Sequence, residues 1–522
     1  MNLVPTVPGT TPSYWCTWCV QGFDVEKWDK DVQPEAENNL HGQDNLTEKQ
    51  VFVDPGWATR FMAAARADLY LLFDLGWDVP IKTAILPEQW RLGSLEVDQE
   101  RFPSCTGTAV ERLCRLQEMV RAAGWRGTGL WVAANAFGDG RDGKFFSAAE
   151  QEAYWRERAR WCAAAGIAYW KVDFGLRAGD LAFRNLLTRV AEEEAPDLCV
   201  EQAVNIGPLN DIEAPYNDFF STGQGRYKTW ANGAVLAKAA ALLPHSHTFR
   251  SYDTSAQLSI ATTLDRITEL LRSATQSQAS ALLNCEDEVY LGAALGCAIG
   301  VMRHPRWRAC EGVDLDPWRV HRRMDEVTRA VRWQRLAPAF ASGMVPVELS
   351  EKLLRDVWYF KPGDTWANWV TGREIVQQAP AITARGLPLP TVHVEEGPEP
   401  FVVAARHPNG AVSVATLPRI ATERGYIEPL ADVTVEIGAG NAPVGIFGVY
   451  NTLTLRLSEP LGSRRIWAQD LKGSTASDIS SRVIRDPMAI TLSGDLLREV
   501  GLSAADAGDL SHPGLVLAIR NY

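Results

Sequence analysis

The sequence predicts a (β/α)₈ barrel followed by an antiparallel β-sandwich, as domains over residues 1–345 and 346–522. Short apolar runs alternate with longer helical patterns over about the first 300 residues, and beyond residue 345 short strand-like runs follow one another between turns. The length of 522 residues also favours two domains. A doubly wound open sheet is the alternative for the first part, but no glycine-rich phosphate loop follows the first strand.

Eight apolar runs are the expected barrel strands, and most are separated by amphipathic stretches. Near-continuous apolar runs are typical of parallel strands that are buried on both faces. Ser147 with Glu150 forms a capping-box signature, and Gly166 is the expected stop of the same helix. The expected strands are 14–19, 69–74, 128–133, 168–173, 198–204, 218–222, 248–252 and 281–285. The expected helices are 57–67, 108–123, 148–165, 181–194, 232–243, 257–277 and 289–303.

Turn sequences separate short strand-like runs in the C-terminal part of the chain. Pro362-Gly363-Asp364 separates the runs 357–360 and 365–370, and Pro408-Asn409-Gly410 separates 401–405 and 411–416. Both patterns indicate hairpins. Further short runs follow as far as residue 519, which predicts the sandwich.

Composition excludes several classes of partner. A net charge of −12 argues against nucleic acid and anionic membranes, which call for basic patches. No apolar run is long enough to cross a bilayer, and residues 1–13 lack the pattern of a signal peptide. Nine scattered cysteines, Cys16-x-x-Cys19 included, fit buried thiols in a reducing cytoplasm. We expect a cytoplasmic protein without metal or cofactor, and leave homo-oligomer formation open.

The fourth expected strand ends in a pair of opposite charges. Period-two alternation puts Lys171 and Asp173 on one face of the strand. Charges that face a barrel interior are costly unless they are paired or used. A nearby Lys favours an ionised Asp, which a nucleophilic carboxylate requires. The alternative is a buried Lys–Asp ion pair without chemistry.

Other expected strand ends carry residues that suit a sugar. Asp74 can accept bonds from two hydroxyls, although it can also serve as an N-cap. Tryptophan offers a flat apolar face and one N–H donor, so several of them together can wall a pyranose pocket. The tryptophans at or near strand ends are Trp15, Trp18, Trp77 and Trp131.

Taken in order, five blocks resemble the melibiase-type α-galactosidase superfamily, whose members are retaining α-glycosidases with a catalytic barrel and a C-terminal β-sandwich. The resemblance implies that Asp173 is the nucleophile and that Lys171, Asp74 and Trp131 line the sugar site. Lys-x-Asp-Phe-Gly also resembles the related α-glucosidase and α-xylosidase family. The five blocks are Trp15-x-x-Trp18, Phe73-Asp74-x-Gly-Trp77, Arg101-Phe102-Pro103-Ser104, Gly129-Leu130-Trp131 and Lys171-x-Asp173.

Two departures weaken any implication of galactose. Leu75 stands where the galactosidase-type enzymes usually carry a second acid that faces the O4/O6 edge of the sugar. The Trp-Asn-Asp-Pro-Asp-Met block of those enzymes is also absent. The resemblance therefore indicates the superfamily rather than a particular sugar.

A retaining mechanism needs a second carboxyl group as acid/base. The run Phe249 to Asp253 resembles the family's Arg-plus-Asp pattern on strand six, so we expect Asp253 in that role and Arg250 at the substrate. Our own count makes this run strand seven, which leaves Asp218 as an alternative. Glu201 on strand five is an expected substrate contact, and its alternative is a buried ion pair.

These expectations combine into a retaining, exo-acting α-glycoside hydrolase that releases a monosaccharide from a carbohydrate substrate. Two other classes stay open. One is a sugar lyase or isomerase in which Lys171 and Asp173 transfer protons. The other is a non-catalytic sugar-binding barrel, an interpretation that Leu75 favours.

Overall fold

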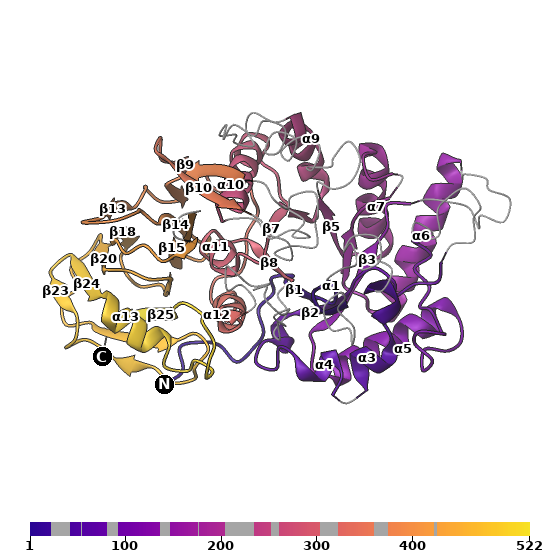
Figure 1. Cartoon of the computed structure of the whole chain (residues 1–522), viewed down its shortest axis with the longest axis horizontal. Helices are drawn as coiled ribbons and strands as arrows, with labels where there is room; N and C mark the ends of the chain where they lie inside the picture. The colour runs from indigo at the N-terminus through magenta and orange to yellow at the C-terminus, as the bar shows by residue number, and fades with distance from the viewer. Residues whose placement is uncertain are drawn as a thin grey trace.

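Eight parallel strands close into a barrel in the computed structural model of the chain (Figure 1). The last strand pairs back onto the first at Tyr14 and Trp15, which confirms the predicted fold class. The strands are β1 (Tyr14–Cys16), β2 (Tyr70–Phe73), β3 (Gly127–Val132), β4 (Tyr169–Val172), β5 (Cys199–Ala203), β6 (Thr248–Arg250), β7 (Leu282–Glu286) and β8 (Ala298–Val301). The structure describes residues 1–21, 42–53, 55–80, 92–135, 147–175, 177–203, 234–251, 260–302, 322–359, 374–421 and 425–521.

Helices surround the barrel, and local sequence signals set several of their ends. Ser147 caps α6 through a complete capping box with Glu150, and Gly166 ends the helix in the left-handed conformation at φ 70°. None of the helices among the described residues is both long and apolar enough to span a membrane. The helices are α1 (Trp18–Gln21), α3 (Glu48–Phe52), α4 (Trp57–Arg60), α5 (Ala109–Ala122), α6 (Ala148–Ala165), α7 (Leu181–Glu194), α9 (Ala234–Leu242), α10 (Ile260–Ser277), α11 (Val289–Ala294) and α12 (Asp325–Trp333).

The strand count from the sequence is wrong in its second half. Strand β5 pairs directly with 248–250, so that segment is the sixth barrel strand rather than the seventh. The run 218–222, which the sequence predicts as strand six, lies outside the described residues. The predicted helix 289–303 instead divides into α11 and β8. Gly296 between them has φ 67°, which turns the chain from helix to strand.

Two sheets form the C-terminal sandwich, and both are mixed rather than purely antiparallel. The larger has the order β22-β21-β25-β19-β15-β14-β12-β9, and the smaller β13-β18-β20-β24-β23. The pairs β12–β14, β15–β19 and β18–β20 run parallel because the chain crosses between the sheets before it returns. Hairpin β14–β15 forms around Pro408-Asn409-Gly410 as predicted. Strand β10 pairs along its whole length with β11, and the run 365–370, predicted as its hairpin partner, lies outside the described residues.

The strands of the larger sheet are β9 (Val347–Leu349), β12 (Ile382–Arg385), β14 (Phe401–Arg406), β15 (Val412–Leu417), β19 (Val444–Phe447), β21 (Arg465–Asp470), β22 (Ser477–Asp478) and β25 (Gly514–Arg520). Those of the smaller sheet are β13 (Thr391–His393), β18 (Asp432–Gly438), β20 (Thr452–Leu457), β23 (Ile484–Asp486) and β24 (Ala489–Ser493), and α13 (Gly494–Gly501) follows. Two further hairpins are β10 (Leu353–Tyr359) with β11 (Glu374–Pro380), and β16 (Arg419–Ala421) with β17 (Gly425–Ile427).

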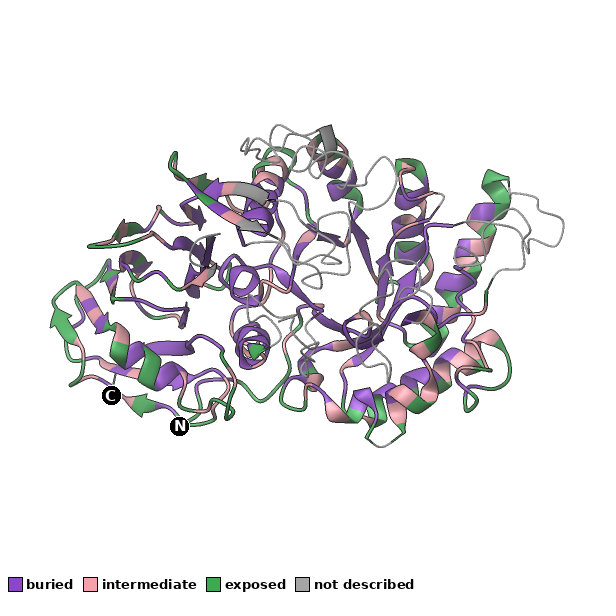
Figure 2. Ribbon diagram, viewed as in Figure 1, coloured by how far each residue is buried: buried purple, intermediate pink, exposed green. Residues whose placement is uncertain are grey.

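The central strands β14, β15 and β19 of the larger sheet are buried along almost their whole length, as Figure 2 shows. Alternate residues of β14 belong to different cores: Phe401 and Val403 pack into the core that includes the barrel, and Val402 and Ala404 into the core between the sheets. Because alternate side chains of a strand point to opposite faces of its sheet, β14 packs into both cores and so joins the two domains. We place the domain boundary near residue 345, between the end of α12 and the start of β9.

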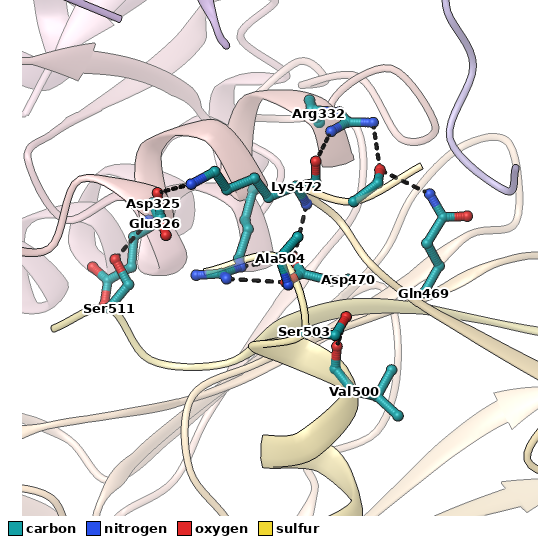
Figure 3. Close-up of polar contacts among 12 residues, drawn as sticks. Asp325, Glu326, Arg332, Gln469, Asp470, Lys472, Val500, Ser503, Ala504 and Ser511 are labelled. Atoms are coloured by element: carbon teal, nitrogen blue, oxygen red, sulfur yellow. Dashed lines mark hydrogen bonds and ion pairs between the residues drawn. The ribbon is translucent and has the colours of Figure 1, made fainter. Parts of the chain in front are cut away.

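Buried polar contacts reinforce this junction at α12 (Figure 3). Arg329 donates to both carboxylate oxygens of Asp470, from Nε at 2.9 Å and from Nη2 at 3.1 Å, and both side chains are buried. Nearby, Lys472 donates to Asp325 at 2.5 Å, and the backbone N–H of Glu326 donates to Ser511 Oγ at 2.9 Å. The last helix of the barrel is thus fixed to the sandwich by charge as well as by apolar packing.

We expect Arg329→Met to lower the free energy of unfolding by about 3–5 kcal/mol, because it leaves the Asp470 charge buried without its cation. Thermal melting of barrel and sandwich should fall together. Arg482→Met is the control: it breaks an equally bidentate pair with Glu499, but one in which both side chains are exposed, so the melting temperature should not change. Equal losses in the two variants would contradict this role for Arg329.

Candidate functional site

The side chains of β1 alternate between the barrel interior and the helices. Tyr14 and Cys16 point inward, where they contact residues of β5 and of the turn after β2. Trp15 points outward and stacks on Trp125, with ring centroids 5.5 Å apart and an interplanar angle of 23°. Trp15 therefore does not wall a pocket in the interior, contrary to the expectation. Trp18, the first residue of α1, is half-buried.

Lys171 finds its partner on another strand. Its Nζ donates to Asp74 Oδ2 at 2.9 Å, and both side chains are buried. The Cys16 thiol donates to the same oxygen at 2.9 Å, and the N–H of Leu75 donates to Oδ1 at 2.8 Å. Burial opposes the charged form of Lys171, but the neighbouring Asp74 outweighs it and holds the pKa of Lys171 above its usual value. The predicted pairing of Lys171 with Asp173 is thus replaced by an ion pair with Asp74.

Asp173 directly follows β4 and is held by its neighbours on one side. Trp131 on β3 donates its Nε1–H to Oδ2 at 2.8 Å, and Arg184 on α7 donates to the backbone carbonyl at 3.0 Å. Oδ1 lies 3.5 Å from Nη2 of Arg250, and none of the described residues donates a hydrogen bond to it. One carboxylate oxygen is fixed, and the other retains its lone pairs.

The charges around Asp173 favour its ionised form. Burial alone would raise the pKa of this carboxyl group. The positive charges of Arg250 and Lys171, with the hydrogen bond from Trp131, outweigh burial and bring the pKa below its ordinary value. A buried carboxylate that stays ionised is the form in which an aspartate acts as a nucleophile.

Trp77 and Trp131, the two inner tryptophans, support the Asp173 carboxylate. Trp77 donates its Nε1–H to the backbone carbonyl of Trp131 at 2.9 Å, and Phe174 meets the Trp131 ring edge-on at 5.2 Å between centroids. Both tryptophans are buried. Trp131 positions Asp173 through its hydrogen bond, and Trp77 positions Trp131 in turn.

Glu201 on β5 lies deeper and is completely buried. Tyr169 Oη and Asn284 Nδ2 donate to its Oε2 at 2.7 and 2.5 Å, and Nε of Arg250 lies 3.4 Å from Oε1. Burial raises the pKa of Glu201. This environment favours the alternative interpretation of Glu201, an ion pair inside the barrel rather than a substrate contact.

Asp253 and its alternative Asp218 both lie outside the described residues. Arg250, three residues before Asp253, ends β6, so the Arg-plus-Asp pattern does begin on the sixth strand, as the resemblance implied.

Sequence reasoning missed several interior residues. Tyr14, Asn284 and Glu286 contact Glu201 or one another within the barrel. Their strands were predicted, but nothing marks which alternate residues of an apolar run face inward. Asp287, at the carboxyl end of β7, has the rare positive φ of 57° and accepts a bond from the N–H of Met302 at 2.7 Å. A positive φ at a non-glycine residue leaves no signal in a single sequence.

The described side chains include no cluster that would bind a metal ion. Within the described ranges, no three His, Cys, Asp or Glu side chains are grouped so that they could hold one. The described thiols are unpaired with one another, and burial raises the pKa of Cys16 and of Cys19 well above the usual value. Cys16 ends β1 and Cys19 lies in α1, so the expected strand 14–19 is shorter than predicted.

No protein-family model and no curated protein matches the chain. Among solved structures, a candidate α-galactosidase from Bacteroides fragilis shares 11% identity over 98% of this chain and 79% of that chain, with a TM-score of 0.41. A GH27 β-L-arabinopyranosidase from Geobacillus stearothermophilus shares 10% identity over 98% and 97%, with a TM-score of 0.37. A candidate α-N-acetylgalactosaminidase from Bacillus halodurans shares 11% identity over 100% of both chains, with a TM-score of 0.38.

Proposed function

We propose that this chain is a retaining α-glycoside hydrolase of the melibiase-type α-galactosidase superfamily. The observation that carries the proposal is Asp173: an ionised carboxylate at the carboxyl end of a barrel strand, with one oxygen held by Trp131 and the other without a donor among the described residues. Carboxyl ends of barrel strands are where the chemistry of this fold takes place. The five sequence blocks, all in the order of the superfamily, support the same conclusion.

In the proposed mechanism, Asp173 Oδ1 attacks the anomeric carbon while Asp253 gives a proton to the departing glycosidic oxygen. The carbon–oxygen bond to the aglycone breaks as the bond to Asp173 forms, which yields a covalent glycosyl-enzyme. Asp253, now ionised, takes a proton from water, and the resulting attack releases the sugar and regenerates Asp173. Asp173 attacks from the face opposite the departing group, and water then attacks from the face opposite Asp173. The two inversions together release the sugar with its configuration retained.

The buried pair of Lys171 and Asp74 supports a role in binding sugar hydroxyls. The Lys171 ammonium has three donors, and one is used on Asp74. Asp74 accepts from Lys171, Cys16 and the Leu75 N–H, so its oxygens are fixed in direction. We expect Lys171 to donate to a hydroxyl of the bound sugar. Leu75 is itself buried and has no polar group on its side chain, so we assign it no contact with the C6 edge of the substrate.

We expect Asp173→Ala to lower turnover of an aryl α-glycoside by at least about 10³-fold, because it removes the nucleophile. The assay uses nitrophenyl α-glycosides of galactose, glucose, xylose, arabinose and N-acetylgalactosamine. Asp486→Ala, which changes an exposed aspartate of the sandwich, is the control and should retain full activity. Activity of Asp173→Ala within tenfold of the parent would contradict the proposal.

Asp253→Ala should be rescued by azide or by a substrate with a good leaving group, because these remove the need for an acid or a base. The measurement is kcat with and without azide, together with the configuration of the glycosyl azide formed. Asp218→Ala is tested in parallel. Rescue of that variant instead would transfer the acid/base role to Asp218.

Trp131→Phe should move the acid limb of the kcat/KM profile to higher pH by about one unit, since the hydrogen bond to an ionised carboxylate is worth about 1.5–3 kcal/mol. The pKa of Asp173 is lowered in the folded protein, so activity is present above that pKa and is lost as the pH falls through it. Loss of the Trp131 donor raises this pKa, so activity is lost earlier on acidification. An unchanged acid limb would contradict the assignment of the limb to Asp173.

A further inference from the structure

A layer of buried polar side chains lies inside the barrel, against Arg250. It is built from strands on opposite sides of the barrel: Tyr14 from β1, Glu201 from β5, Arg250 from β6, and Asn284 and Glu286 from β7. All five are essentially without solvent exposure. Bulk solvent does not reach these side chains, so the protonation state of each must be compatible with those of its neighbours.

The Tyr14 hydroxyl has more carboxyl partners than it has protons. Its oxygen lies 3.3 Å from Glu201 Oε1 and 3.2 Å from Glu286 Oε1, and Asn284 Nδ2 donates to it at 3.2 Å. A phenol donates one hydrogen bond and accepts two. If it donates to one carboxylate, the second carboxyl group must donate to it, which requires that this group carries a proton. Two ionised carboxylates would leave one unscreened contact between oxygens.

The charges lead to the same requirement. Arg250 lies 3.5 Å from Asp173, 3.4 Å from Glu201 and 3.8 Å from Glu286, so three carboxyl groups share this cation. Lys171, the other cation that acts on Glu201 among the described groups, is already engaged by Asp74. Carboxyl groups that crowd together in a buried site do not all ionise. Because Arg250 and Trp131 keep Asp173 ionised, the neutral group belongs to the two glutamates.

The directions of the Tyr14 and Glu201 pKa values agree with this distribution. Burial, followed by the charges of Glu201 and Glu286, raises the pKa of Tyr14 well above its usual value, so the phenol keeps its proton. Burial also raises the pKa of Glu201 despite the neighbouring Arg250. Tyr169 and Lys171 on β4 and Cys199 on β5 also act on Glu201, and burial likewise raises the pKa of Tyr169 and of Cys199.

We propose that Glu201 and Glu286 hold one proton between them through the Tyr14 hydroxyl, so that Arg250 faces one anion in this pair and one at Asp173. Glu286 and Tyr14 are then positioning residues that act on Asp173 through Arg250. Their effect on catalysis rests on the proposed glycosidase function, but the shared proton does not. Full ionisation of the pair would draw the guanidinium away from Asp173.

Infrared spectroscopy of the unmutated protein tests the proton directly. Protein labelled with ¹³C at the glutamate carboxyl groups should show, at about pH 7.5, a carboxylic acid C=O band that shifts with the label. Asp78 and Asp356, whose pKa burial raises to about 6, carry no such label and do not interfere. Absence of a glutamic acid band at this pH would overturn the proposal.

Glutamine variants test the positioning role. Glu286→Gln should remove the band and leave the acid limb of kcat/KM in place, because one anion, Glu201, still balances Arg250. Glu201→Gln/Glu286→Gln removes that anion, so the charge of Arg250 acts on Asp173 alone and the limb should move to lower pH by about one unit. Equal shifts in the single and double variants would overturn the role. A protein with the band but without glycosidase activity would refute the proposed function and leave the shared proton standing.

Discussion

The interior of the barrel depends on keeping buried charges compensated. Arg250 and Lys171 lie without solvent between strands that contribute four carboxyl groups, and every other feature of the site follows from how these charges are divided. Lys171 is paired with Asp74, and Arg250 is the described cation that lies against the free oxygen of the Asp173 carboxylate. A buried ion pair adds little stability by itself, but the loss of one partner is expensive. The arrangement therefore fixes the ionisation of Asp173 rather than the stability of the fold.

The sandwich contributes to this arrangement at a distance. Helices α11 and α12 lie between the barrel and the larger sheet, where Tyr290 and Trp333 both contact the ring of Phe447. Strand β7, which supplies Asn284 and Glu286, leads directly into α11. The position of the β7 end is therefore set by the sheet behind it as well as by the barrel. The two domains behave as one packing unit around α11 and α12.

Local signals were predictable, and partners across space were not. The helix 148–165 could be predicted to the residue because Ser147, Glu150 and Gly166 define it through contacts within one turn. Strand β8 falls within the predicted helix 289–303 because Ala298–Val301 is short and apolar, and only its pairing with β1 and β7 selects the strand. Alternation identified Lys171 and Asp173 as facing inward, but Asp74, 97 residues earlier, was not predictable as the partner of Lys171. The outward direction of Trp15, which stacks on Trp125, was not predictable for the same reason.

The segment before β1 has a bearing on the order of events during synthesis. Gln469 on β21 accepts from the N–H of Leu3 at 2.6 Å and donates to the side chain of Asn2 at 2.7 Å, and the N–H of Ala476 donates to the carbonyl of Met1 at 2.9 Å. These partners leave the ribosome more than 460 residues after the segment they bind. Residues 1–3 therefore cannot form these contacts until β21 and the turn after it have been made.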